Sequence, residues 1–269
     1  MSKNIFLHEF RTHLKSVLTW SLAITALILF FFSIFPSFAE QAELTSQLLA
    51  KFPPALLEAF GMTHMDLSSM LGYFSLIMVF IQLCLAIQAG NYGFGLVSIE
   101  ESELTADFLL SKPVSRTQVL TGKLLAALAS LMVTDLVITL ATFLAFTLFN
   151  GGRTYELGTL ILLLVSMPIL QLFFLCLGLV ISLLVKRVRS VTPYSLGLGF
   201  GAYVLNAFSG VFGDVKLEFI TPFKHLDPVY IVEHAAYAIP LLLLNIAISL
   251  IALGVSYWLY VRRDIPAVS

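Results

Sequence analysis

Residues 70–97, MLGYFSLIMVFIQLCLAIQAGNYGFGLV, decide the fold of this chain. From Leu67 to Ile99 there is not a single Asp, Glu, Lys or Arg. A helix needs roughly 20 apolar residues to cross the hydrocarbon of a bilayer, where every backbone N–H and C=O must find its partner inside the helix. This stretch is therefore predicted to be a membrane-spanning helix.

The rest of the chain has the same character. Hydrophobic residues make up 59% of the 269 residues, charged residues make up 12%, and the mean hydropathy is +0.96. A soluble core of this length does not need so much apolar sequence, whereas a bilayer does. We expect an all-α fold, a single membrane domain over residues 1–269 with six transmembrane helices. Their expected ranges are about 17–38, 70–97, 119–149, 157–185, 192–212 and 239–261.

The basic residues predict the orientation of these spans. With six spans both termini lie on the same side, and that side would hold eleven of the 15 Lys and Arg residues. Positively charged loops stay in the cytoplasm. We therefore expect a multi-pass protein of the cell membrane with both termini cytoplasmic. No basic patch with interleaved aromatic residues is present, so a nucleic-acid partner is not expected.

The leading segment, residues 3–16, has an amphipathic pattern. Its apolar side chains recur at helical spacing, with basic residues elsewhere around the helix. Such a helix is expected to lie flat at the cytoplasmic interface, against the lipid head groups. The alternative is an ordinary lead-in to the first span. The apolar positions are Phe6, Leu7, Phe10, Leu14 and Val17.

A charged stretch, Glu100–Lys123, stands between the second and third expected spans and reads EESELTADFLLSKPVSRTQVLTGK. Pro113 must interrupt a helix there, because proline lacks the backbone donor and clashes with the preceding turn. Ser115 and Gln118 have the spacing of a capping box, which predicts a new helix at once. We call residues 100–123 the coupling module and expect it to dock a soluble partner. A merely solvated connector is the alternative.

The run EE-x-E-L-T-x-x-F-L-L-S-K-P-V-S-R, followed by G-K-L-L, resembles the ABC type-2 exporter permease family. Two further segments agree, Leu56–Tyr73 and Phe219–Ile231 before the last span. The resemblance covers most of the chain. It implies an interfacial helix, six spans that form half of a transporter, and a re-entrant or surface helix before the last span. It also implies that the loop between spans two and three binds a separate ATP-binding subunit.

Carried over to this sequence, the resemblance assigns residues to that interface. The approach to the coupling helix would comprise Glu100, Glu101, Glu103 and Leu104, and its body and turn Phe108, Leu109, Leu110, Pro113 and Arg116. The sequence departs from the family at Thr105-Ala106-Asp107, where Gly-Thr is common, which leaves the local turn geometry open.

The chain is not expected to hydrolyse ATP itself. The nearest approach to a phosphate-binding loop is Gly122-Lys123, but Thr117 replaces the first glycine and Leu124 follows the lysine. ATP and Mg²⁺ are therefore expected on the partner subunit, and no cofactor, metal or catalytic residue is expected here. The other expected partner is a second copy of this chain or a related permease. The cargo stays open, with outward transport expected.

Asp135 is the only Asp, Glu, Lys or Arg between Leu124 and Gly152. Because a carboxylate within a membrane span is costly, it is a candidate for the translocation path. The alternatives are a structural Asp that is protonated or hydrogen-bonded, or an Asp at a water-filled crevice. The glutamines and asparagines within the spans are expected to bond between helices; they are Gln82, Gln88, Asn91, Gln171 and Asn206.

Two other classes of membrane protein fit the sequence less well. A self-sufficient secondary transporter would use Asp135. Such transporters usually carry internal repeats and several intramembrane charges, whereas this sequence shows no evident repeat and only Asp135 as a charge away from the ends of the expected spans. An intramembrane prenyl-protein protease would need an arginine at position 105 after Glu100-Glu101, where this chain has Thr105. Cys84 and Cys176 lie in apolar spans and are expected to be packing residues rather than a disulfide.

Overall fold

The structure is a computed structural model. It describes residues 3–41, 51–53, 66–102, 115–185, 188, 190–209 and 217–262, without the side chains of residues 3, 99–102 and 209. All regular elements in these ranges are helical, which confirms the predicted all-α class. They are α1 (Lys3–Glu40), α4 (Met70–Ser102), α6 (Arg116–Phe149), α7 (Leu157–Leu184), α8 (Val191–Ser209), the 3-10 turn η1 (Leu217–Phe219), α9 (Pro222–His225), α10 (Pro228–His234) and α11 (Ile239–Arg262).

Five of the described helices, α1, α4, α6, α7 and α11, are long and apolar enough to cross a membrane. The expected span at 192–212 corresponds to α8, which has 19 residues. α8 is not among the five described helices that are long and apolar enough to cross a membrane. The multi-pass character of the chain is therefore clear, whereas the count of six spans stays a prediction.

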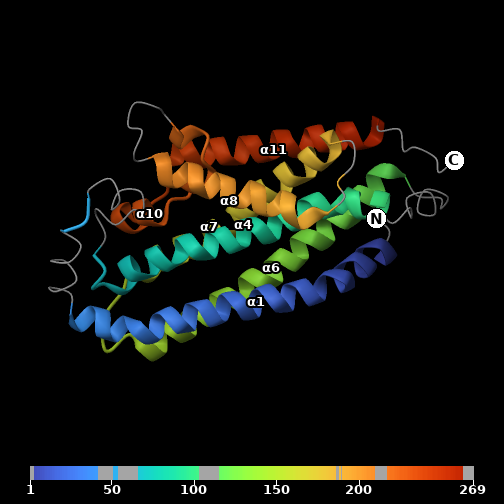
Figure 1. Ribbon diagram of the computed structural model, residues 1–269. Coiled ribbons are helices and arrows are strands. Elements are labelled where there is room, and N and C mark those ends of the chain that lie inside the picture. The colour runs from blue at the N-terminus through green and yellow to red at the C-terminus, as the bar shows by residue number, and fades with distance from the viewer. Residues whose placement is uncertain are drawn as a thin grey trace.

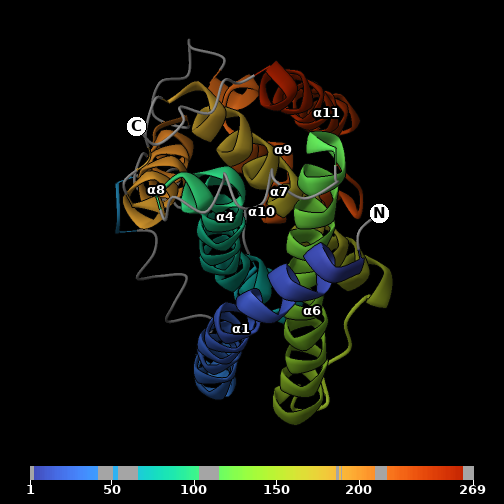
Figure 2. The ribbon, with the colours of Figure 1, turned by 90° about the vertical axis from the view of Figure 1, so that its right-hand side faces the viewer.

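The leading segment is not a separate helix. Residues 3–40 form one continuous α1, with no break where the expected interfacial helix 3–16 would meet the first span. The buried side chains of α1 follow one stripe, through Ile24, Ile28 and Phe32. Figure 2 shows the first turns of α1 running across the bundle end and the remainder running along its length. The separate interfacial helix is thus not confirmed.

The long helices run side by side, and the two ends of the bundle differ (Figure 1). At one end α1 and α6 begin and α4 and α11 end. We call this the module end, because the two helices that flank residues 103–114 in the sequence, α4 and α6, end and begin there. The most extensive contacts are those of α4 with α7 and of α1 with α6. α11 lies on the far side of the bundle from α1 in both views.

Away from the module end, aromatic side chains fill the core between α1, α4 and α6. Phe32, Phe74 and Phe146 are fully buried, and the Phe146 ring centroid lies 5.1 Å from that of Phe32 and 5.4 Å from that of Phe74. Aromatic pairs at this separation add to the stability that burial of their area provides.

Cys84 and Cys176 are both free thiols, as expected.

Two glycines let α4 and α7 approach almost to backbone contact. A Cβ atom added to Gly93 would overlap the carbonyl oxygen of Leu175 on α7. One added to Gly178 would lie 3.1 Å from the carbonyl oxygen of Gly90 on α4. Small residues at such crossings allow the close packing that holds membrane helices together, since burial from water cannot drive that association within lipid.

We predict that Gly93→Ala destabilises the protein by about 1–3 kcal/mol, the usual cost of forcing an extra methyl group into a packed contact. Thermal unfolding of the detergent-solubilised protein measures this. Gly201→Ala on α8 is the matched control, because nothing lies within 4 Å of the added Cβ there. Equal midpoints for the two variants would show that the α4–α7 crossing is not tightly packed.

Candidate functional site

Most of the residues assigned to the ATPase interface lie outside the described residues. Glu103, Leu104, Phe108, Leu109, Leu110 and Pro113 are all among them. Glu100 and Glu101 belong to the last turns of α4, and nothing is described of their side chains. What the structure does place is the frame of the coupling module, that is, the end of α4 at Ser102 and the start of α6 at Arg116.

The start of α6 is firmly capped. The Ser115 hydroxyl accepts a hydrogen bond from the Gln118 backbone N–H, and the Gln118 side-chain oxygen accepts one from the Ser115 N–H, each at 3.3 Å. The predicted capping box is thus confirmed. Since it satisfies backbone donors that the first helical turn leaves open, α6 begins as a stiff, capped helix at Arg116.

Arg116, the first residue of α6, reaches the end of α11. Its Nη1 donates a hydrogen bond of 3.3 Å to the carbonyl oxygen of Val261, one residue before α11 ends at Arg262. A cation beside the last carbonyls of a helix is favourable, because those carbonyls carry the negative end of the helix dipole. Arg116 therefore joins the coupling module to the last helix, in addition to any role at the surface.

Lys123, the last residue of the coupling module, is not at the surface. Its side chain is 3% exposed, and its Nζ donates a hydrogen bond of 2.8 Å to the carbonyl oxygen of Leu96 on α4. The same Nζ lies 3.6 Å from Oε1 of Glu9 on α1. The close approach of α1 to α6 that permits this occurs at Gly122, where an added Cβ would lie 3.2 Å from Ile5.

The polar side chains continue from Lys123 along one face of α6. Ser130 Oγ lies 3.4 Å from His13 Nδ1 on α1, and the His13 ring stacks on Tyr92 of α4 with centroids 4.4 Å apart. One turn further, Thr134 Oγ1 accepts a hydrogen bond of 3.0 Å from Gln88 Nε2 of α4. These residues form a buried polar column between α1, α4 and α6.

Asp135 lies beside this column and is 7% exposed. Gln171 of α7 faces its carboxyl group, but no hydrogen bond of ordinary geometry joins the two side chains. Of the expected interhelical bonds, those of Gln82, Gln88 and Asn91 are confirmed. For Gln171 none is found within the described residues.

Sequence reasoning missed the Glu9–Lys123 pair and the polar column. It counted Lys123 among the residues of the cytoplasmic surface, because the lysine closes a charged run. The signal that could have placed it is the spacing of Lys123, Ser130 and Thr134, which puts all three on one face of a helix. Glu9 and His13 have the matching spacing of four residues on α1.

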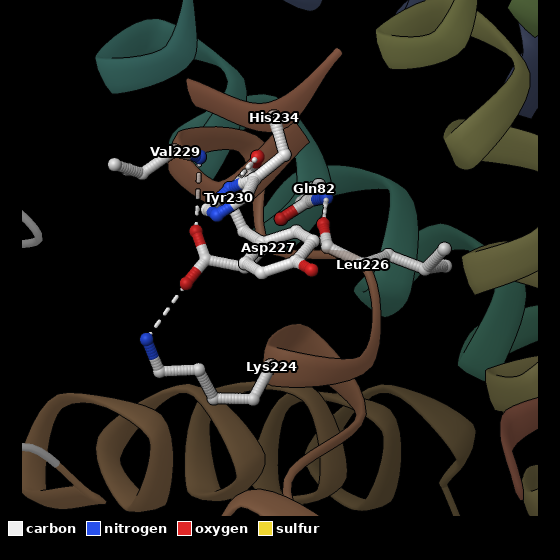
Figure 3. Close-up of polar contacts among 7 residues, drawn as sticks. All are labelled: Gln82, Lys224, Leu226, Asp227, Val229, Tyr230 and His234. Atoms are coloured by element: carbon white, nitrogen blue, oxygen red, sulfur yellow. Dashed lines mark hydrogen bonds and ion pairs between the residues drawn. The ribbon is translucent and has the colours of Figure 1, made fainter. Parts of the chain in front are cut away.

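At the other end of the bundle, the short elements η1, α9 and α10 form the segment expected before the last span. Figure 3 shows Gln82 of α4 pointing to the Leu226 carbonyl, to which its Nε2 donates a hydrogen bond of 2.8 Å. Asp227 caps α10 by accepting from the Val229 N–H at 2.9 Å, and it pairs with Lys224 at 2.7 Å. The segment is thus bonded directly to a spanning helix.

His225 of this segment is buried, and its burial favours the neutral form. Burial lowers its pKa, opposed by hydrogen bonds to the carbonyls of Phe219 and Glu218. The Nε2–H donates to the Phe219 carbonyl at 3.2 Å, and Nδ1 accepts from Asn245 Nδ2 of α11 at 3.4 Å. One ring nitrogen donates and the other accepts, which is the pattern of a neutral imidazole.

Comparison with known proteins agrees with the resemblance seen in the sequence. The model of the ABC-2 family transporter proteins matches residues 3–265, nearly the whole chain. No curated protein shows significant sequence similarity to the chain.

We predict that Lys123→Met destabilises the protein by about 1.5–3 kcal/mol, because a buried hydrogen bond made by a charged group is lost. The change is measured by SDS titration in mixed micelles. Lys15→Met is the control, since Lys15 is exposed on α1 and the same change should stay within about 0.5 kcal/mol there. A Lys123→Met variant as stable as the control would contradict the structural role assigned to the ammonium group.

Proposed function

The chain belongs to the ABC-2 family of transporter proteins, and we propose that it is the permease subunit of an ATP-driven exporter. In this proposal the helices form the translocation path, and the coupling module docks on separate ATP-binding subunits that carry ATP and Mg²⁺. The family match supports a membrane subunit of an ABC transporter that is a transport subunit rather than an enzyme. The contacts at the module end are the observation that supports the remaining part of the proposal, namely that the coupling module transmits motion from the ATP-binding subunits to the helices.

The placement of the coupling module supports its docking role. α4 ends at Ser102 and α6 begins at Arg116 at the same end of the bundle, so both flanks of the coupling module lie at that end (Figure 1). The sequence between these flanks contains the apolar residues Leu104, Phe108 and Leu109 among charged ones. A few apolar side chains surrounded by polar ones is the composition of a protein interface.

Force applied to the coupling module would reach four helices. α6 begins as a capped, stiff helix at Arg116, and that residue is bonded to the end of α11. Two turns further, Lys123 is bonded to α4 and paired with α1. Closure of the ATP-binding subunits would therefore shift the bundle between its inward-open and outward-open populations through these contacts.

The membrane setting follows from the same proposal. The module end faces the cytoplasm, where ATP is found, and both termini lie on that side. The segment η1–α10 then lies toward the opposite face of the cell membrane. Two permeases, identical or related, would share two ATP-binding subunits, and Asp135 would lie near the translocation path. The apolar character of the bundle is compatible with several classes of cargo.

We predict that Leu109→Asp reduces the ATPase activity that co-purifies with the permease at least about tenfold. A carboxylate placed in an apolar contact costs more than the 1.4 kcal/mol that this factor represents. The tagged permease is extracted from its native membrane in mild detergent, and ATP hydrolysis by the eluate is assayed with and without vanadate.

Phe52→Asp is the matched control for this experiment. Phe52 is exposed and belongs to the segment 51–53 at the other end of the bundle (Figure 1), so ATPase recovery should be unchanged. If wild-type permease brings down no ATPase in several mild detergents, the coupling proposal fails. Cargo transport by the purified chain without ATP, lost in Asp135→Asn, would instead favour a secondary transporter.

A further inference from the structure

Unsatisfied polar atoms gather where α4, α6 and α7 meet. Both carboxyl oxygens of Asp135, both amide atoms of Gln171 and the Oε1 of Gln88 are buried without a hydrogen bond in the described part of the chain. Gln171 is 1% exposed and Gln88 is fully buried. Buried polar groups in native proteins are nearly always hydrogen-bonded, so these five atoms need a partner that the neighbouring side chains, as placed, do not provide.

The balance of donors and acceptors among these atoms indicates which kind of partner they can bind. Four of the unsatisfied atoms are oxygens that accept hydrogen bonds, whereas a single amide nitrogen can donate. Rotating the Gln171 amide by half a turn, which exchanges its oxygen and nitrogen, leaves the same four acceptors and one donor. An anion does not suit this set of acceptors, whereas a hydrogen-bond donor, such as water or a protonated acid, or a cation does.

We propose that Asp135 and Gln171 form a proton-binding site, in which Asp135 is a neutral carboxylic acid. One proton taken from water converts the carboxylate to the acid. The acid O–H then donates to Gln171 Oε1, and the Gln171 Nε2 donates to the other carboxyl oxygen. A single proton thereby satisfies four of the five open atoms through two reciprocal hydrogen bonds, with a small rotation of the side chains.

The surroundings favour a proton over a permanent charge. No charged side chain of the described residues acts on the Asp135 carboxyl. The titratable groups on the packed elements make their contacts elsewhere: His13 on Tyr92 and Ser130, Tyr92 on Gln88, Lys123 on Leu96 and Glu9, and Tyr257 of α11 on Thr121. Cys84 on α4 and Cys176 on α7 are free thiols. An ionised carboxylate buried without a counter-ion is costly.

The bound proton would hold α6 and α7 together. When it is bound, the acid–amide pair holds the two helices together without water. When it leaves, the carboxylate needs hydration, and water must enter between the helices. The site is independent of the coupling module. A negative result for the proton site would therefore leave the proposed docking of an ATPase untouched, and the reverse is also true.

Infrared spectroscopy of the purified full-length protein tests this site. We expect the carbonyl band of a protonated carboxylic acid at neutral pH in the wild type and its loss in Asp135→Asn. Gln171→Leu should keep the band but shift it to higher frequency, since the acid loses its hydrogen-bond partner. Gln82→Leu is the matched control: it removes another buried glutamine, bonded to Leu226, and should leave the band in place.

Three results would overturn the proposal. The first is identical acid bands in wild type and Asp135→Asn, which would mean that Asp135 is ionised. The second is a band that Gln171→Leu does not shift. The third is a pH dependence of the acid band that changes with the concentration of Na⁺ or K⁺, which would assign the site to a metal cation. Asp135→Asn should unfold at the wild-type midpoint, because an amide can replace the neutral acid; if it does not fold, the Gln171→Leu shift still decides.

Discussion

The ammonium group of Lys123 is the contact on which the arrangement at the module end depends. It lies 3% exposed inside the bundle, donates to the Leu96 carbonyl of α4 and pairs with Glu9 of α1. Removing a lysine from water is costly, so these contacts must offset that cost, and they do so only when three helices keep their relative positions. The lysine therefore fixes the register of α6 against α1 and α4 just inside the coupling module.

The bundle combines two kinds of helix contact with different consequences for motion. α4 and α7 meet through Gly93 and Gly178, almost backbone to backbone, and such a crossing allows little sliding. α6 meets α1 and α4 through the aromatic core at Phe146 and also through polar side chains, at Lys123, Ser130 and Thr134. Hydrogen bonds of this kind can be exchanged for others or for water.

Much of the fold follows from the sequence, because long uncharged runs in a membrane leave only the helix as a solution. The capping box at Ser115 and Gln118 was equally predictable, since it depends on local geometry alone. The first sixteen residues were harder: their amphipathic pattern suits both an interfacial helix and the first turns of the long α1 that the structure contains. The burial of Lys123 depends on contacts between three helices distant in sequence, which periodicity along one helix does not reveal. Most of the predicted ATPase interface lies outside the described residues and stays a prediction.

The central claim is that Lys123 passes motion from the coupling module into the bundle. It is tested most directly by the distance between spin labels on exposed Leu18 of α1 and exposed Val255 of α11, measured in the assembled complex after Cys84 and Cys176 are replaced by alanine. The account predicts that ATP shifts this distance distribution in the parent protein and that Lys123→Met abolishes the shift while the ATPase remains bound. An undiminished shift in Lys123→Met would contradict it.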